Sequence, residues 1–370
     1  MGEWKMSQQQ TDLRGYIPPS LPLAQALETK IVLKKTITAN VALARLNGAT
    51  ALIPNQAVLI NSLILQEAKD SSEIENIITT HDDLYRSTID QTNLSQSVKE
   101  VRYYGEALRK GFELVTQNKL LLTRDIVQIQ SLLEKNDAGI RKQGGTCLKN
   151  DQTGEVIFTP PQFEDDIRNA LANLERYIND AELDDIDPLI KMAIIHHQFE
   201  TIHPFYDGNG RTGRILNILY LVLNELLDLP ILYLSRYITT HKADYYRLLQ
   251  SVRTDQAWEE WILFMLDGIE QTANQTITLI HQVDKLIHQT ADEIQAFSTK
   301  LYSKDLLEAL FVHPYTKIEF IEQRLNITRQ TASKHLKQLE ELGILKSTKL
   351  GNSKYFINHR FYELLSSPQF

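Results

Sequence analysis

The stretch His203-Pro-Phe-Tyr-Asp-Gly-Asn-Gly-Arg-Thr-Gly-Arg214, followed directly by the apolar run ILNILYLVLNELLDL (215–229), indicates the fold more clearly than any other part of the 370-residue chain. Two glycines flank Asn209, so the backbone there can approach a ligand without a Cβ in the way. The apolar run has the length and composition of a buried helix. A loop that enters such a helix leaves the first N–H groups of the helix unpaired, and these groups form a seat for an anion.

Charged side chains complete this loop. Arg211 and Arg214 lie three residues apart in the first helical turn, so both guanidinium groups face one side and can bind two phosphate groups. Asp207 supplies one carboxylate, and a single carboxylate together with substrate phosphates is a usual arrangement for Mg²⁺. Histidine, here His203, is suited to take a proton from a hydroxyl. The combination predicts transfer of a phosphorus-containing group from a nucleotide.

The rest of the chain is mostly helical in pattern. Apolar residues recur at helical spacing from Leu23 to about Leu84 and in most later segments up to residue 297. A stretch rich in Gly, Thr and Asp interrupts this pattern at 141–161 and predicts one short hairpin. The tail predicts a short helix, a three-residue turn at 326–328, a longer helix and two strands around Gly351-Asn352, which is the order of a winged helix-turn-helix.

Composition and charge limit the function classes. Hydrophobic residues make up 42% of the chain and charged residues 23%, which is typical of a globular protein. The net charge is −8, but residues 300–370 carry +4, which leaves −12 on residues 1–299. Polar residues interrupt the most apolar stretch, so we expect no membrane span. The single cysteine, Cys147, cannot form an intrachain disulfide, and we expect a cytoplasmic protein.

HPFYDGNGRTGR resembles the HPFx(D/E)GNGRxxR signature of Fic-domain protein adenylyltransferases at every fixed position. This resemblance implies that AMP is transferred from ATP to a Ser, Thr or Tyr hydroxyl of a target protein, with release of pyrophosphate. It implies that His203 is the catalytic base and that Asp207 holds Mg²⁺. The residues that it assigns to ATP binding are Phe205, Asp207, Gly208, Asn209, Gly210, Arg211, Arg214, Tyr245 and Tyr246.

Two further segments resemble parts of the same family. Glu155, Val156, Ile157 and Phe158 resemble a flap that docks a target segment by strand addition, although a simple surface hairpin has the same pattern. The pair Tyr245-Tyr246 resembles tyrosines near an adenine pocket, although aromatic pairs at this spacing also occur in helix cores.

An upstream motif predicts regulation. The sequence Ser71-Ser-Glu-Ile-Glu75-Asn76 resembles the inhibitory (S/T)xxxE(G/N) helix of the family, with Ser71 and Glu75 four residues apart. If Glu75 paired with Arg214, it would occupy the guanidinium group that the γ-phosphate needs, and ATP would bind unproductively. An ordinary exposed glutamate on a helix is the alternative.

We therefore expect an all-α fold with a small β-hairpin flap, divided into an N-terminal helical domain (1–95), a Fic catalytic domain (96–272), a linker helix (273–298) and a winged helix-turn-helix (299–370). The expected partners are target proteins, including the protein itself. A homodimer is left open, and so is DNA binding by Arg329, Gln330, Ser333, Lys334 and Lys337. Two other functions also remain open: transfer of a different phosphate-containing group, and a DNA-binding regulator whose helical body senses ATP.

Overall fold

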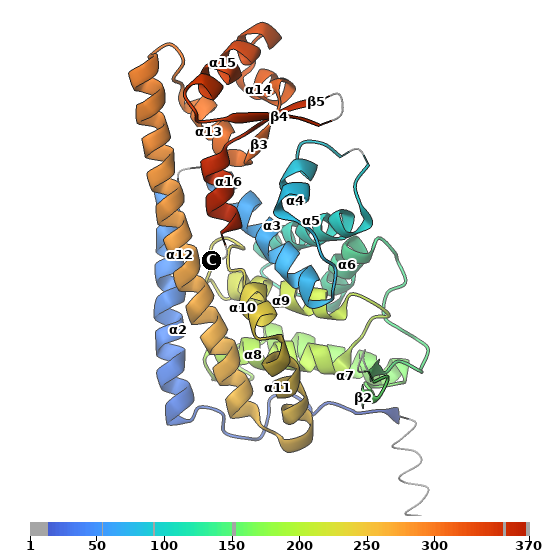
Figure 1. Cartoon of the computed structure of the whole chain (residues 1–370). Coiled ribbons are helices and arrows are strands. Elements are labelled where there is room, and N and C mark those ends of the chain that lie inside the picture. Colours follow the sequence, from blue (N-terminus) through green and yellow to red (C-terminus); the bar gives the residue numbers. More distant parts are fainter. Residues whose placement is uncertain (1–13, 54, 92, 150–152, 351–352, 368–370) are drawn as a thin grey trace, which may run out of the picture. The chain divides into compact units, whose positions relative to one another are not determined.

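A computed structural model describes residues 14–53, 55–91, 93–149, 153–350 and 353–367. The described chain is mainly α-helical with two small antiparallel sheets (Figure 1), and this confirms the predicted fold class. No described helix is both long and apolar enough to cross a membrane. The chain divides into two compact units. The first unit comprises the described residues of 1–41, 103–230 and 234–270, and the second comprises those of 42–102, 231–233 and 271–370.

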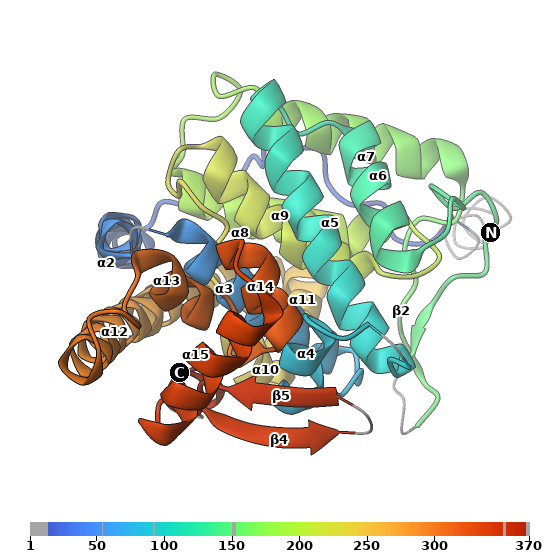
Figure 2. The same cartoon turned by 90° about the horizontal axis from the view of Figure 1, so that it is seen from above.

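Two buried helices form the centre of the first unit. Helix α8 (Pro188–Ile202) and helix α9 (Asn209–Leu223) pack against each other, and α7 (Glu164–Asn179) packs on α8 (Figures 1 and 2). Asp187 caps α8 by accepting a hydrogen bond from the Leu189 N–H at 2.8 Å, and Pro188 takes the first helical position. Helix α6 (Thr123–Glu134) covers α9 from another side. The loop between α8 and α9 is the 203–214 motif.

The other elements of the first unit follow from local sequence. Strands β1 (Leu148–Lys149) and β2 (Val156–Phe158) pair antiparallel and form the predicted small hairpin. Helices α10 (Ser235–Thr240) and α11 (Lys242–Asp255) follow α9. Three helices run from one unit into the other: α2 (Lys30–Ala49), α5 (Gln96–Asn118) and α12 (Trp258–Phe297).

The second unit combines N-terminal helices with the C-terminal part of the chain. Its N-terminal elements are η1 (Thr50–Leu52), α3 (Gln56–Ile74) and α4 (His81–Ser87). Its C-terminal elements are α13 (Lys304–Val312), β3 (Tyr315–Thr316), α14 (Ile318–Leu325), α15 (Arg329–Glu341), β4 (Lys346–Leu350), β5 (Ser353–Ile357) and α16 (His359–Ser366).

The C-terminal elements have the predicted helix-turn-helix and hairpin order. Asn326 ends α14 in the left-handed region with φ 51°, and Thr328 caps α15 by accepting a hydrogen bond from the Thr331 N–H. Strands β4 and β5 form the hairpin, as Figure 2 shows, and β3 joins them in a sheet of order β3-β5-β4. The turn at 351–352 lies outside the described residues.

Candidate active site

The backbone conformation of His203 sets the direction in which its side chain leaves the main chain. His203 ends α8 in the left-handed region, with φ 48° and ψ 61°, and its N–H donates to the Phe199 carbonyl at 3.0 Å. Residues other than glycine seldom adopt this conformation unless surrounding contacts hold it. Here the Arg141 Nε donates to the His203 carbonyl at 2.8 Å, and the Arg141 N–H donates to the Pro204 carbonyl at 2.9 Å. The chain therefore leaves α8 in one fixed direction.

Arg141 connects this loop to the hairpin. Its side chain is fully buried, and its Nη2 donates to the carbonyl of Pro161, just after β2. Burial lowers the pKa of the guanidinium group to about 10. One side chain thus binds the backbone at His203 and at the base of the hairpin. Sequence reasoning missed Arg141, because an isolated arginine 62 residues before its partner gives no local pattern.

Asn209 closes the loop by a backbone-like pair of hydrogen bonds. Its Oδ1 accepts from the Phe205 N–H and its Nδ2 donates to the Phe205 carbonyl, both at 2.8 Å. Phe205 is fully buried and its ring lies 6.3 Å from that of Phe199. The two residues fix the curvature of the loop before α9 begins.

Gly208 brings the backbone into α9. It has φ 74°, and its carbonyl accepts the first helical hydrogen bond, from the Thr212 N–H at 2.9 Å. The next N–H groups belong to the first turn of α9, where the helix itself offers no acceptor. Asp207 is exposed beside this turn, and its carboxylate accepts a hydrogen bond from the Gly208 N–H at 2.7 Å.

The donor set fits Mg²⁺ that is bound mainly by a nucleotide. Asp207 presents one exposed carboxylate next to a helix start that attracts phosphate. The described residues contain no cluster of three or more His, Cys, Asp or Glu side chains that could hold a metal alone. Asp207 would therefore contribute one ligand, with phosphate oxygens and water completing the coordination.

Both arginines of the loop are buried in α9. The Arg211 Nη2 lies 2.9 Å from Oε1 of Glu134, and these side chains are only 4% and 13% exposed. The positive charge of Arg214 acts on the pKa of two other side chains. It helps to lower the pKa of His196, and it opposes the rise in the pKa of Tyr245.

The last turn of α6 supports the loop from outside the motif. Gln130 donates from Nε2 to the Asp207 carbonyl at 3.2 Å, and Glu134, one turn later, binds Arg211. A Cβ at position 208 would collide with the Glu134 carboxylate. Glycine at this position is therefore favoured by φ, and an added Cβ would displace the Glu134 side chain from its place beside Arg211. Sequence reasoning missed both α6 residues, because only the tertiary fold brings them to the loop.

The predicted tyrosine pair is split between core and surface. Tyr245 is buried, and its hydroxyl lies 2.8 Å from His196 Nε2. Tyr246 is 48% exposed, and the two rings meet edge to face with centroids 5.2 Å apart. Tyr246 is thus the member of the pair that solvent can reach.

The hairpin also has an inner and an outer side. Glu155, Val156 and Ile157 are exposed, whereas Phe158 is buried. The Arg253 guanidinium group lies 3.8 Å from the centre of the Phe158 ring. Phe158 anchors the hairpin, and the side chains of the preceding three residues face solvent.

The upstream motif lies at the end of α3 in the second unit. Ser71 is fully buried on the last turn, Glu75 is the C-cap, and Asn76 has φ 63°. The Asn76 N–H bonds to the Glu73 carbonyl and the Ile77 N–H to the Ser72 carbonyl, both at 3.0 Å. These two bonds define a Schellman helix end, which needs Gly or Asn at the left-handed position. The residues of the 203–214 loop belong to the first unit.

Comparison with known families finds three successive matches. Residues 33–113 match the Fic/DOC family N-terminal domain, residues 120–221 match the Fic/DOC family domain, and residues 286–361 match the C-terminal domain of SoFic-like protein adenylyltransferases.

Individual relatives are more distant. A probable protein adenylyltransferase of Aquifex aeolicus (strain VF5) is 29% identical over 199 residues, which is 52% of this chain and 58% of that protein. A protein adenylyltransferase of Caenorhabditis elegans, fic-1, is 30% identical over 125 residues, or 32% of this chain and 24% of that protein. The alignments thus span less than two thirds of these relatives.

Solved structures support the fold. A Fic family protein from Desulfovibrio desulfuricans G20 has a TM-score of 0.58 at 21% identity and covers 92% of this chain and 98% of its own. Fic-1 from Caenorhabditis elegans has a TM-score of 0.52 at 18% identity over 68% of this chain and 73% of its own. Together with the complete signature loop at the start of α9, the three matched domains show that this chain belongs to the Fic/DOC family.

Proposed function

We propose that this protein is an adenylyltransferase that moves AMP from ATP to a hydroxyl group of a target protein, or of itself. The observation that supports the proposal is the 203–214 loop, in which His203 ends α8, Asp207 lies exposed just before α9, and Arg211 and Arg214 are buried in α9. Relatives named as protein adenylyltransferases support the same activity.

In the proposed reaction the triphosphate lies at the start of α9. Arg211 and Arg214 bind phosphate oxygens, and Asp207 would hold Mg²⁺, which would offset the negative charge of the phosphates when bound. His203 takes the proton of the target hydroxyl, whose oxygen then attacks the α-phosphorus. The bond from the α-phosphorus to the bridging oxygen breaks, and pyrophosphate leaves. We assign Tyr246, which is 48% exposed, to the adenine, and the exposed residues Glu155, Val156 and Ile157 of the hairpin to a target strand.

Intact-mass spectrometry tests this activity. The purified protein, incubated with ATP and Mg²⁺, is expected to gain the mass of one or more AMP groups. His203→Ala is expected to lose about 10²–10⁴-fold in rate, because it removes the positioned base. His241→Ala is the matched control, since His241 lies at the start of α11 outside the loop. A His203→Ala variant that is as active as wild type would overturn the assignment.

We further propose that Glu75 inhibits this activity by competing with the γ-phosphate for Arg214. The support is the motif itself and the Schellman end that fixes Glu75 just after the last turn of α3. Glu75→Gly is then expected to raise the rate of AMP transfer. Glu73→Gly is the control, because Glu73 pairs with Lys69 at 2.9 Å on the same turn. Equal rates for Glu75→Gly and Glu73→Gly would contradict the proposal.

A second function is favoured by the surface of α15. Its exposed face lines an open groove of about 620 Å³ that includes Arg329, Gln330, Ser333, Lys334, Lys337 and Gln338. Such side chains suit phosphate and base contacts of duplex DNA. A full-length Lys334→Glu/Lys337→Glu variant should lose salt-dependent DNA binding, while Lys304→Glu should not. Failure of the wild type to bind duplex DNA at low salt would exclude this function.

A further inference from the structure

The segment after the inhibitory motif is short and well defined at both ends. It begins at the Schellman end of α3 and reaches the N-cap of α4 at Thr80, whose hydroxyl accepts from the Asp83 N–H at 3.1 Å. Glu75 therefore lies only five residues before Thr80. A link of this length limits how far Glu75 and α4 can separate.

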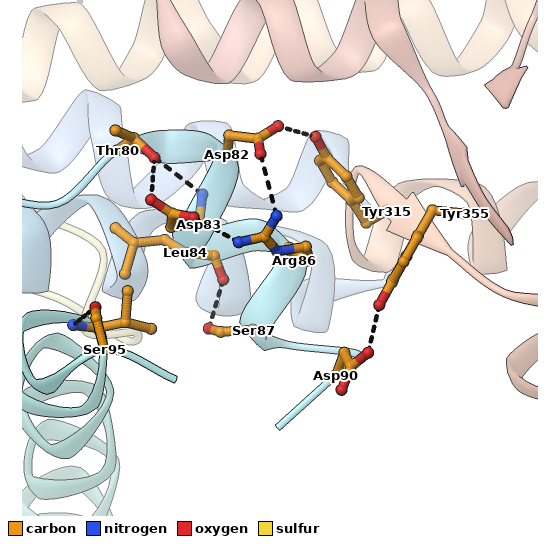
Figure 3. Close-up of polar contacts among 11 residues, drawn as sticks. Thr80, Asp82, Asp83, Leu84, Arg86, Ser87, Asp90, Ser95, Tyr315 and Tyr355 are labelled. Atoms are coloured by element: carbon orange, nitrogen blue, oxygen red, sulfur yellow. Dashed lines mark hydrogen bonds and ion pairs between the residues drawn. The ribbon is translucent and has the colours of Figure 1, made fainter. Parts of the chain in front are cut away.

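Carboxylates in and after α4 bind the C-terminal sheet, as Figure 3 shows. The Tyr315 hydroxyl, on β3, donates to Asp82, and the Tyr355 hydroxyl, on β5, donates to Asp90. The Lys317 Nζ also lies 3.1 Å from the Asp90 carboxylate and 4.5 Å from the centre of the Tyr355 ring. We call these five residues the latch.

The latch is protected from water on the sheet side. Tyr315 and Tyr355 are 3% and 2% exposed, and burial is the largest cause of the raised pKa of both hydroxyls. Hydrogen bonds from a neutral hydroxyl to a carboxylate in such surroundings are stronger than exposed ion pairs. The two tyrosines of the latch are therefore shielded from solvent, whereas the Asp82 side chain is 50% exposed.

The same C-terminal elements also hold α3. Gln66 Nε2 donates to the Leu365 carbonyl at 2.8 Å, and Asn55 Nδ2 donates to the Glu308 carboxylate at 2.8 Å. The ring of Tyr85, on α4, meets that of Tyr362, on α16, edge to face with centroids 5.9 Å apart. The helix that carries the motif and the helix that follows it are thus both fixed to the C-terminal elements.

From these contacts we propose that the winged-helix part of the chain is the regulator of the inhibitory motif: through the latch it keeps α3 and α4 in the position from which Glu75 inhibits. This inference rests on the proposed function, namely that Glu75 inhibits AMP transfer. Loosening the latch shifts the population toward a state in which Glu75 no longer competes, without any change in the 203–214 loop. The winged helix then has a role in enzyme regulation whether or not it binds DNA.

The test is a double-mutant cycle on the full-length protein. Tyr315→Phe/Tyr355→Phe removes two hydroxyls and keeps both rings. Loss of hydrogen bonds worth about 1 kcal/mol in total corresponds to a rise in transfer rate of about five-fold. In a Glu75→Gly background the same pair of substitutions should change nothing, because the inhibition is already absent. Tyr302→Phe, at a half-buried tyrosine of the same unit outside the latch, is the control.

Hydrogen exchange supplies a readout that does not depend on turnover. The double variant should exchange faster over residues 75–90, with α13 to α16 protected as in the wild type. If α13 to α16 lose protection too, Asp82→Asn/Asp90→Asn takes the place of the tyrosine double variant. An asparagine has the shape of the aspartate, and its amide oxygen still accepts a weaker hydrogen bond from the tyrosine hydroxyl.

The outcomes separate the two proposals. If Glu75→Gly raises the transfer rate but neither double variant does, the latch inference is wrong and the proposed inhibition stands. If the latch variants raise the rate equally in the Glu75→Gly background, they act elsewhere, and the latch inference is again wrong. If Glu75→Gly itself has no effect, the proposed inhibition fails and the latch has nothing to regulate.

Discussion

Side chains from outside the 203–214 loop hold its backbone and Arg211 in place. The sequence was sufficient to predict roles for His203, Asp207 and the two arginines, because they lie within twelve consecutive residues. It could not reveal Arg141 or Glu134, which lie on other elements and reach the loop only after folding. The loop sequence thus predicts the reaction, whereas the residues that support the loop can be identified only from the structure.

Glu134 is expected to position Arg211 for phosphate. Glu134→Ala leaves the buried guanidinium without this partner, so we expect ATP affinity to fall by about ten-fold, or about 1.4 kcal/mol. Glu134→Gln keeps one acceptor oxygen and should recover part of this loss. Titration calorimetry measures both, with Glu113→Ala, an exposed glutamate, as the control. An unchanged affinity in Glu134→Ala would show that Arg211 needs no such support.

Two buried histidines predict a pH dependence of stability. Burial, with the charge of Arg214, lowers the pKa of His196 to about 3, and burial, with the charge of Arg253, lowers the pKa of His197 well below its ordinary value of 6.5. Below pH 6.5 these two histidines bind protons in the unfolded chain but not in the folded one. The free energy of unfolding therefore falls as the pH drops from about 6.5 toward 3. Between pH 7.5 and 5, His196 alone contributes about 2 kcal/mol of this loss, and His197 acts in the same direction.

Urea unfolding at several pH values checks this dependence. His196→Gln, which cannot titrate, should give a shallower fall than the wild type over the same range. Equal slopes for the two proteins would mean that His196 gains its proton in the folded state.

Helices were predictable wherever apolar periodicity is strong, and their ends less so. The pattern from Leu23 suggested an early helix, but α2 begins at Lys30, because Thr29 caps it by accepting a hydrogen bond from the Val32 N–H. The two-residue strand β3 has no alternation to detect, and α16 depends on the Asn358 cap. Strand β3 and helix α16 could be identified only from the structure, where they pack against other elements of the second unit.

Substitution of Gly208 tests how the backbone enters α9. Gly208→Ala should destabilise the loop and abolish tight ATP binding, because position 208 needs φ 74° and a Cβ there would meet Glu134. Gly139→Ala is the matched control: φ there is 65°, but the space around the added Cβ is open among the described residues. Thermal unfolding should show a loss of about 1 kcal/mol for Gly139→Ala and a larger one for Gly208→Ala. Equal losses of stability in the two variants would show that contact with Glu134 adds nothing to the cost of a Cβ at position 208.

The whole molecule combines segments that lie far apart in the chain. The sequence predicted consecutive domains, and those boundaries stay a prediction; the compact units instead draw on separated stretches, with α2, α5 and α12 running from one into the other. Composition along the chain carries no record of which distant segments pack together. That residues 71–76 and the C-terminal elements belong to the same unit could therefore be learned only from the structure.

We propose that the 203–214 loop directs the α-phosphorus of ATP to a protein hydroxyl, and labelled ATP tests this step. The Glu75→Gly variant is incubated with Mg²⁺ and ATP that carries the label on either the α- or the γ-phosphate. We expect the protein to acquire label from the α-phosphate alone, and His203→Ala in the same background to acquire none. Label from the γ-phosphate would indicate phosphorylation and label from neither would indicate a nucleotide sensor, and either result would rule out AMP transfer by this loop.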